Sequence, residues 1–412
     1  MNIFQSDKDI VPYAQLCKKM GVYPFFRKID KVDGPFVEVD GKQAIMVGSN
    51  DYLGLSQNKR VIDAAEAAMR RWGSGPGGSR FLCGNAGVIE ELEESIAAMV
   101  GKKRAIVFAT GFMANSGTLV CLTGPGNLVL YDRESHASII EGLKRSKAKT
   151  VSFPHNNMDT VDRKLAAFKE KHPEMERLVV TEGVFSMSGS VADMPALAAM
   201  KERDPEFKIY LDDAHGLGVM GNGRGTAAHF GVTDQVDVIM GTFSKSLASV
   251  GGFIASDDLD WLEYLQLKSR TLIFSAALPA ASAAAALESS RIILEEPERV
   301  QRLWDRTAQA RKGFLERGIR IVDGQAPVIG VLIGDEMKSL FLSLELLKRG
   351  VFALPAVYPA VAPGKAIIRV AFTSSHTESQ VEQVLDAFRE VSRLSISDDP
   401  SEVFSQAMRM VG

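Results

Sequence analysis

One lysine of this sequence stands where an amine can do covalent chemistry. Lys245 lies in residues 241–246 (GTFSKS), directly after the apolar run of residues 236–240. Lysine side chains usually stay on the surface as hydrated charges. Small residues and hydroxyls at the end of a buried strand leave the amine poorly hydrated, so that it can form an imine with a carbonyl group. We predict that Lys245 is such a nucleophile, with Thr242 and Ser244 donating hydrogen bonds to a phosphate.

An acidic pair and a histidine follow a second apolar run. Asp212, Asp213 and His215 come directly after residues 208–211 (KIYL). Pyridoxal 5′-phosphate (PLP) needs a carboxylate against its pyridine nitrogen, because the protonated ring then draws electrons from the substrate. Asp212 is the candidate for that carboxylate, and His215 for a partner of the ring 3-hydroxyl. Without Lys245, the acidic pair would be interpreted as a helix cap or a turn.

A third apolar run, residues 104–109, is followed by residues 110–115 (TGFMAN), which open a helix. The free N–H groups at a helix start bind phosphate, and Gly111 permits close approach to it. An ordinary turn between a strand and a helix explains this segment equally well when it is taken alone.

Two more strand ends carry polar side chains. His136 follows residues 127–131 and offers an aromatic ring for one face of the cofactor, although a capping histidine has the same pattern. Ser186 follows residues 178–181 and offers a hydroxyl near the ring; the alternative is a turn serine. All of these groups follow predicted strands, and open α/β sheets bind ligands at the carboxyl ends of their strands.

The elements that must position these residues alternate along the chain. From about residue 100, short apolar runs predicted as strands, with residues 251–255 as one more, alternate with helix-like stretches such as residues 159–171 and 195–203. This alternation predicts an α/β fold with a mostly parallel central sheet that is covered on both faces. We predict an N-terminal segment (1–45), a large cofactor-binding domain (46–294), a smaller α+β domain (295–396) and a tail (397–412). In the smaller domain, residues 320–322, 327–333 and 366–372 are strand candidates, and residues 381–391 predict a final amphipathic helix.

Composition excludes several classes of function. The 412 residues carry 48 basic and 51 acidic side chains, and this balance gives no reason to expect nucleic acid as a partner. Cys17, Cys83 and Cys121 lack metal-ligand spacing, so no metal site is expected. No apolar stretch is long enough to span a bilayer, and residues 1–9 lack the pattern of a signal peptide. We expect a cytoplasmic protein, with a peripheral contact with the inner face of the membrane left open.

Taken together, the motifs resemble those of the α-oxoamine synthase family of fold-type I PLP enzymes, from about Tyr23 to Leu394. The motifs that carry the resemblance are GSNDYLGL (48–55), GSGPGGSR (73–80), TGF (110–112), SHAS (135–138), EGVFSM (182–187), DDAHG (212–216), TFSKS (242–246), PAVAPG (359–364) and Ile368-Arg369.

The resemblance implies a role for each matched residue. Lys245 carries PLP as a Schiff base and moves the substrate Cα proton, while His136 stacks on the ring. The phosphate is held by Gly111, Phe112, Thr242 and Ser244. Arg369 grips the carboxylate of the amino acid, with Asn50 and Ser79 at the substrate. Members of the family are homodimers with the active site at the interface, so Ser275 is expected to reach the partner's phosphate.

Within the family, four stretches are most similar to bacterial serine palmitoyltransferases: residues 77–82, 214–225, 241–252 and 369–377. Ser188 and Ser190 depart from those enzymes, in which acidic residues are commoner at one or both of these positions. This resemblance implies a decarboxylative condensation of L-serine with palmitoyl-CoA to 3-ketodihydrosphingosine, the first step of sphingolipid synthesis. The alternative is a sibling synthase of the 8-amino-7-oxononanoate or 2-amino-3-ketobutyrate type, which uses alanine or glycine. An aminotransferase and a non-catalytic partner subunit are less favoured, the latter because such subunits lack the lysine.

Overall fold

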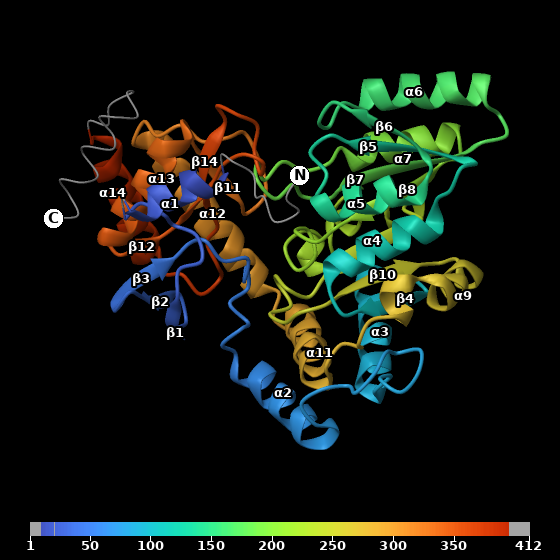
Figure 1. The fold of residues 1–412 in the computed structure, drawn as a ribbon, viewed down its shortest axis with the longest axis horizontal. Helices are drawn as coiled ribbons and strands as arrows, with labels where there is room; N and C mark the ends of the chain where they lie inside the picture. The colour runs from blue at the N-terminus through green and yellow to red at the C-terminus, as the bar shows by residue number, and fades with distance from the viewer. Residues whose placement is uncertain (1–9, 20, 395–412) are drawn as a thin grey trace. The chain divides into compact units, whose positions relative to one another are not determined.

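The computed structural model describes residues 10–19 and 21–394, and the chain divides into two compact units (Figure 1). The large unit comprises Asn50–Ser186 and Ser190–Leu303. The small unit comprises the described residues of Met1–Ser49, Met187–Gly189 and Trp304–Gly412. The predicted tail, residues 397–412, lies outside the described residues.

The large unit is built around a seven-stranded sheet of order β4-β10-β9-β8-β7-β5-β6. Its strands are β4 (Arg104–Phe108), β5 (Asn127–Asp132), β6 (Lys149–Phe153), β7 (Glu176–Glu182), β8 (Lys208–Asp212), β9 (Val238–Thr242) and β10 (Gly252–Ser256). Strands β5 to β9 pair in parallel, whereas β10 is antiparallel to both β4 and β9. The predicted mostly parallel sheet is therefore confirmed.

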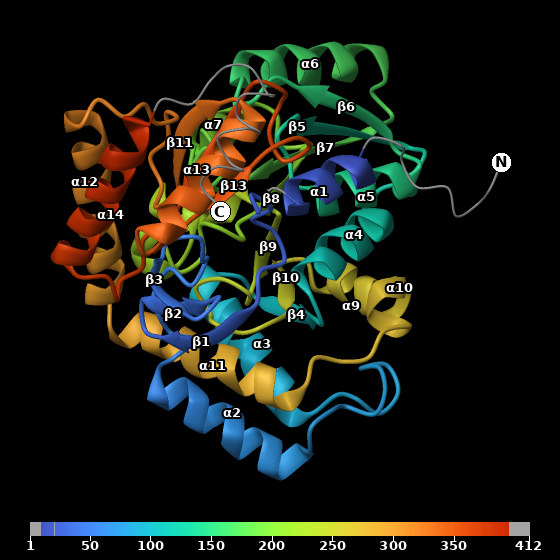
Figure 2. The same ribbon diagram turned by 60° about the vertical axis from the view of Figure 1, so that its left-hand side comes forward.

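Helices cover both faces of this sheet, as a parallel sheet requires. The helices are α2 (Lys59–Trp72), α3 (Gly87–Val100), α4 (Gly111–Leu122), α5 (Ala137–Ser146), α6 (Met158–Lys171), α7 (Met194–Arg203), α8 (Thr226–His229), α9 (Leu259–Lys268), α10 (Arg270–Ile273) and α11 (Ala280–Glu295). Apolar side chains of α4, α5, α9 and α10 pack with alternate strand residues such as Ile106 and Val180. The strand residues between them, Val107 and Val179 among them, are equally buried, so the opposite face is covered too. Figure 2 shows α2, α3 and α11 gathered at one end of the unit.

The small unit contains two sheets. One has the order β1-β2-β3-β12, from β1 (Ile29–Asp33), β2 (Phe36–Val39), β3 (Lys42–Met46) and β12 (Val351–Phe352). The other has the order β11-β14-β13, from β11 (Ile329–Gly334), β13 (Leu354–Ala356) and β14 (Ala366–Val370). The helices are α1 (Ile10–Lys19), α12 (Glu298–Glu316), α13 (Glu336–Lys348) and α14 (Glu378–Ser392), and α12, α13 and α14 share one apolar core with β11 and β14.

Most predicted elements of the smaller domain are present. Helix α14 contains the predicted amphipathic stretch and begins with a capping box between Thr377 and Gln380. The predicted strand at residues 320–322 is reduced to a single bridge between Ile321 and Val331. Across the described residues, no helix combines the length and the apolar character needed to cross a membrane.

A buried histidine makes the small unit sensitive to acid. His376 is 4% exposed, accepts a hydrogen bond from the Thr373 backbone N–H at 2.9 Å, and packs edge-on against Phe372. Burial lowers the pKa of His376 to about 4, because the charged ring would lose its hydration.

The pH dependence follows from this shift. Above about pH 6.5 the ring is neutral in both states, so it has no effect. As the pH falls from about 6.5 to about 4, the unfolded chain binds a proton that the folded chain does not, which lowers the free energy of unfolding by about 3 kcal/mol. His376→Asn keeps an acceptor for Thr373 but does not titrate, so urea denaturation between pH 4 and 7 should show a smaller acid loss. Parallel pH profiles of the two proteins would contradict this prediction.

Candidate active site

Polar side chains from the carboxyl ends of the central strands line a cavity of about 260 Å³ in the large unit. Of the residues predicted from the sequence, the lining contains Gly111, Phe112, His136, Asp212, His215, Thr242, Ser244 and Lys245. The rest of the lining consists of Thr110, Asn115, Ser138, Glu182, Ala214 and Met240. The structure therefore brings these segments together where open α/β sheets bind ligands.

Asp212, at the end of β8, supplies the buried carboxylate of this cavity. Its Oδ2 accepts a hydrogen bond from Nδ2 of Asn115 at 2.7 Å, and its Oδ1 accepts one from the backbone N–H of Ala214 at 3.0 Å. Two N–H donors fix the orientation of the carboxylate and offset part of the cost of its burial. The half-buried Lys245 lines the same cavity, so the predicted amine and acid share one site.

His215 is held by a tyrosine to which the sequence analysis gave no role. The Tyr52 hydroxyl lies 2.7 Å from Nδ1 of His215, and both side chains are buried. Tyr52 belongs to the GSNDYLGL motif, but an apolar ring in a strand-like run is more often core than site. This contact fixes the ring of His215 from the side of Nδ1.

Asp213 differs in function from its neighbour. Its carboxylate accepts hydrogen bonds from the backbone N–H and the hydroxyl of Thr226, at 2.7 and 2.5 Å. Burial raises the pKa of Asp213 to about 6. A Cβ atom on Gly216 would lie only 2.0 Å from Oδ1 of Asp213, and one on Gly225 would lie 2.2 Å from Oδ2. Through these hydrogen bonds and close contacts, Asp213 fixes the conformation of the loop that carries Asp212 and His215.

The start of α4 forms the anion-binding end of the cavity. The first amides of a helix, here those of Gly111 and Phe112, have no partner within the helix and bind anions well. A Cβ atom on Gly111 would lie 2.9 Å from Oγ1 of Thr242, so glycine lets the helix start pack against the end of β9. The Thr242 hydroxyl donates to the carbonyl of Gly251 at 2.8 Å and lies 2.9 Å from the exposed hydroxyl of Ser244.

His136 is the N-cap of α5 and lies beside a buried acid. Its backbone N–H donates to Oε1 of Glu182 at 2.5 Å. Burial lowers the pKa of His136, although Asp212 opposes this shift. Burial, reinforced by Asp212, raises the pKa of Glu182 well above its usual value. Residues Glu182 and Asp212 are paired neighbours of β7 and β8, which is why the charge of Asp212 adds to the rise in the pKa of Glu182.

Five residues predicted for the site lie outside the lining of this cavity: Asn50, Ser79, Ser186, Ser275 and Arg369. Among the described residues, the buried atoms Oδ1 of Asn50 and Oγ of Ser79 have no hydrogen-bond partner, as expected of groups that await a ligand. The Ser275 hydroxyl lies 3.6 Å from Sδ of Met113.

Arg369 belongs to the small unit. It lies on β14, opposite Gly330 of β11 and Leu354 of β13. Its side chain lines a second cavity, of about 420 Å³, whose other lining residues are mostly apolar, Tyr358 among them. A cation beside apolar walls suits a carboxylate that carries an apolar chain.

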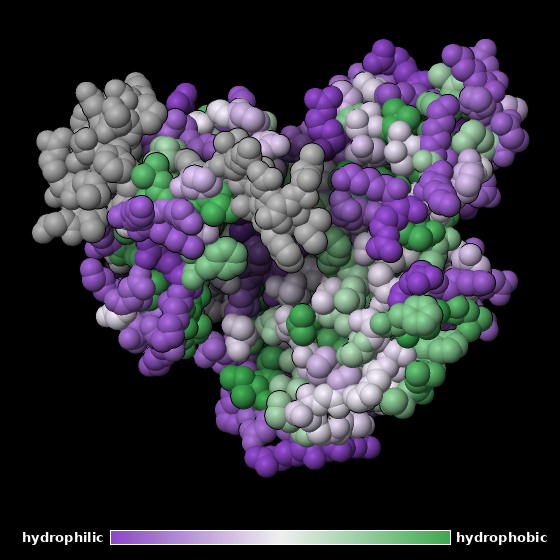
Figure 3. Space-filling model, viewed as in Figure 1, coloured by the Kyte–Doolittle hydropathy of each residue, from purple (hydrophilic) through white to green (hydrophobic). Residues whose placement is uncertain are grey.

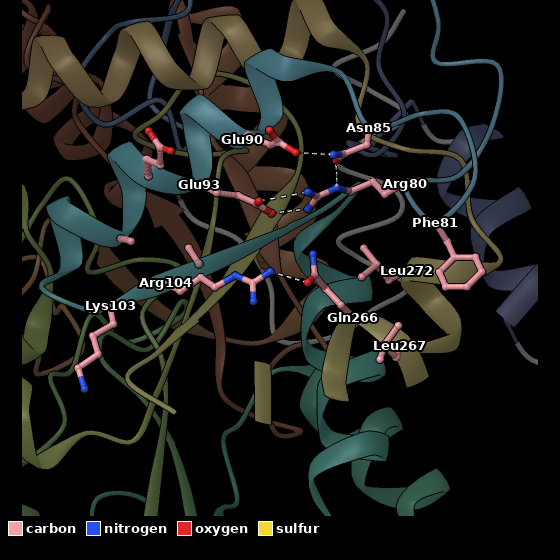
Figure 4. A pocket seen from close by; sticks show the side chains of 13 residues that line it. Arg80, Phe81, Asn85, Glu90, Glu93, Lys103, Arg104, Gln266, Leu267 and Leu272 are labelled. Carbon is pink, nitrogen blue, oxygen red and sulfur yellow. Dashed lines mark hydrogen bonds and ion pairs between the residues drawn. The ribbon is translucent and has the colours of Figure 1, made fainter. Parts of the chain in front are cut away.

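A third pocket of the large unit, of about 550 Å³, contains an arginine paired with a glutamate (Figure 4). Arg80 and Glu93 form a two-bonded ion pair in it, with Nη2 and Oε2 3.1 Å apart. The same two side chains bond the backbone of Val107 on the edge strand β4: Arg80 donates to its carbonyl, and Glu93 accepts from its N–H. This pair therefore satisfies the outward backbone groups of the edge strand at Val107.

Metal ligands do not gather in the residues that the structure describes: no group of three or more His, Cys, Asp and Glu side chains could hold an ion.

Comparison with known proteins identifies relatives along most of the chain. The serine palmitoyltransferase of Bacteroides thetaiotaomicron is 42% identical over 369 residues, which cover 89% of this chain and 92% of the relative. The 8-amino-7-oxononanoate synthase 1 of Bacillus subtilis is 38% identical over 368 residues, 89% of this chain and 93% of the relative.

Solved structures agree with these relatives. The Sphingomonas wittichii serine palmitoyltransferase matches with a TM-score of 0.91 at 31% identity, covering 95% of this chain and 98% of the other. A serine palmitoyltransferase from S. paucimobilis, with a bound PLP–myriocin aldimine, matches with a TM-score of 0.90 at 32% identity, covering 94% and 97%. The model of one family, aminotransferase class I and II, matches residues 42–388, and this chain belongs to that family.

Proposed function

We propose that this chain is a PLP-dependent acyltransferase that condenses L-serine with palmitoyl-CoA, releasing carbon dioxide and 3-ketodihydrosphingosine. The observation that carries the proposal is that Lys245, Asp212, His215 and His136 line one cavity beside the start of α4. Relatives named serine palmitoyltransferase, 40% to 42% identical to this chain, support the choice of substrates.

The donor set of the cavity fits PLP at each end. A buried carboxylate, Asp212, suits a pyridinium nitrogen, and the helix start at Gly111 and Phe112 suits a phosphate. His215, held by Tyr52, suits the 3-hydroxyl. When bound, PLP supplies an electron sink that stabilises negative charge on the carbon next to the substrate amine.

The remaining roles belong to the chain's own residues. Lys245 would hold the cofactor through its side-chain amine and, with serine bound, would accept the proton from the serine Cα. The ring of His136 would cover one face of the cofactor, and Ser186 would add a hydroxyl. Arg369 binds the carboxylate of serine, which orients the bond to be broken, with Asn50 and Ser79 as further substrate contacts.

Removing the amine tests the central role. We expect Lys245→Ala to lose the visible absorbance that PLP gives when bound to a lysine, and to lower the rate of condensation by at least about 10³-fold. Absorbance spectra and a coupled assay of CoA release measure both. Lys144→Ala, an exposed lysine on α5, is the matched control and should behave as wild type. Turnover by Lys245→Ala would remove this lysine from the mechanism.

The substrate assignment competes with one specific alternative, because the Bacillus subtilis relative is named 8-amino-7-oxononanoate synthase 1. Serine, glycine and alanine should each be tested with short and long acyl-CoAs. We expect serine with palmitoyl-CoA to have a kcat/KM at least about tenfold above every other pair, because a site that binds the serine hydroxyl leaves polar groups unpaired with alanine or glycine. Faster condensation of alanine with a shorter acyl-CoA would favour the alternative.

A homodimer and a cytoplasmic location are part of the proposal. In the large unit, two exposed apolar side chains line the pocket that contains Arg80 and Glu93: Leu267 is 56% exposed and Phe81 55%. Leu82, next to Phe81 in the sequence, is 78% exposed, and Phe274, directly after α10, is 76% exposed. Figure 3 shows apolar side chains at the surface near α9. Exposed apolar side chains in such numbers are typical of an interaction surface, and Ser275 follows Phe274 within it.

Charge placed on this surface tests the dimer. We expect the wild-type protein to sediment as a dimer and the double variant Leu82→Asp/Phe274→Asp as a monomer, because burying two unpaired carboxylates opposes association. Sedimentation velocity at micromolar concentration measures this, with the exposed Met69 of α2, as Met69→Asp, for control. A wild-type monomer, or a dimer that tolerates both charges, would contradict the assignment.

A further inference from the structure

A chain of hydrogen bonds runs behind the candidate active site from a tyrosine to a histidine. The Tyr210 hydroxyl donates to Oδ1 of Asn115 at 2.7 Å. Nδ2 of Asn115 donates to Oδ2 of Asp212 at 2.7 Å and to Oγ of Ser138 at 2.9 Å. Oγ of Ser138 lies 2.8 Å from Nδ1 of His136. Tyr210, Asn115 and Ser138 are each at most 1% exposed, so water does not compete for these bonds.

The chemistry of the groups fixes the direction of the first two bonds. A carboxylate only accepts hydrogen bonds, so Asn115 must turn its NH₂ group toward Asp212. The amide oxygen then faces Tyr210, whose hydroxyl must donate. With the amide reversed, its oxygen would face the carboxylate of Asp212, and two acceptors would repel each other. The tyrosine hydroxyl therefore donates to the amide oxygen and stabilises the orientation that serves Asp212.

The direction of the remaining bonds follows from the first two. The second N–H of Asn115 points at Oγ of Ser138, which accepts it. The hydroxyl proton of Ser138 is then free to go to Nδ1 of His136. The backbone N–H of Ser138 also points at Nδ1, at 3.3 Å. A nitrogen that accepts from two donors carries no proton, so the proton of the neutral ring lies on Nε2.

We infer that Tyr210 and Asn115 are positioning residues of this active site: they orient Asp212 toward the cofactor nitrogen and, through Ser138, hold His136 as the Nε2–H tautomer. This inference rests on the proposed function, because it assigns the two ends of the network to the nitrogen and to one face of the same cofactor. The side-chain amide of Asn115 then takes part in fixing both the orientation of Asp212 and, through Ser138, the tautomer of His136.

Packing alone does not account for the tyrosine. The ring of Tyr210 lies in the apolar core with Ile106, Val129 and Met240, where phenylalanine would fill the same volume. Its buried hydroxyl has lost water, and the bond to Asn115 is what compensates for that loss. Tyr210→Phe removes only this oxygen and leaves the amide oxygen of Asn115 without its donor, so that Asp212 and Ser138 alone hold the amide.

The first experiment compares Tyr210→Phe with the wild type and with Tyr264→Phe, an exposed tyrosine of α9. Protein labelled with ¹⁵N in histidine rings is studied by NMR with and without PLP, and the His136 signals are identified by their loss in His136→Gln. We expect Tyr210→Phe to replace the single Nε2–H tautomer of His136 by a mixture. We also expect the dissociation constant of PLP, measured by absorbance, to rise about fivefold to tenfold, as for one lost buried hydrogen bond. Tyr264→Phe should change neither.

A second variant separates the two branches of the network. Ser138→Ala removes the shorter of the two bonds to Nδ1 of His136, leaves only the backbone N–H at 3.3 Å, and keeps the bond between Asn115 and Asp212. We therefore expect some Nδ1–H tautomer to appear beside the Nε2–H form, with PLP affinity within about twofold of wild type. A folded Tyr210→Phe protein with an unchanged tautomer and an unchanged PLP affinity would overturn the inference. If Tyr210→Phe does not fold, Ser138→Ala decides: an unchanged tautomer there overturns the inference, and a mixture supports it.

Both readouts are independent of the acyl-CoA reaction. A wild-type protein that binds PLP and shows one His136 tautomer, but condenses no amino acid with acyl-CoA, would refute the proposed function alone. An active wild type whose Tyr210→Phe variant keeps tautomer and affinity would refute the positioning network alone.

Discussion

A buried carboxylate at the end of β8 is the constraint on which the rest of the site depends. Asp212 is 4% exposed and has to receive its hydrogen bonds from the protein, which accounts for Asn115 and the backbone of Ala214 as its partners. Two more acids, Glu182 and Asp213, lie beside it. Burial raises the pKa of both, so these neighbours give up their protons less readily and add less repulsion around Asp212.

The strand order of the large unit brings the other polar residues of the site to the same edge of the sheet as Asp212. Parallel strands present their carboxyl ends on one edge, so the segments after β5, β7, β8 and β9 meet although they are far apart in the sequence. Where these loops pack most closely, the chain has glycine, whose side chain is a single hydrogen atom. Gly111 and Gly216 have no room for a Cβ atom, against Thr242 and Asp213 respectively. The loops are thereby held in place before any ligand arrives.

The sequence predicted the site best where a reactive side chain directly follows an apolar run, as Lys245, Asp212, His215 and His136 do. It gave no role to Asn115, Tyr210 or Tyr52, because a polar group inside a helix or a strand has no local pattern that separates it from core. It also missed β6, an edge strand in which only Phe153 is buried. Arg369 belongs to the small unit, and the role proposed for Ser275 involves a second copy of the chain; strand patterns carry no information on either.

The way in which the sheet ends at β4 limits how two copies can associate. The outward N–H and carbonyl of Val107 are already bonded by Glu93 and Arg80, so a strand of another molecule finds no pair of free backbone groups at that residue. Joining of two sheets edge to edge is thereby discouraged, both as a route to a specific assembly and as a route to aggregation. Association on this side of the large unit is left to side chains, whose shape and charge can be selective where a bare strand edge is not.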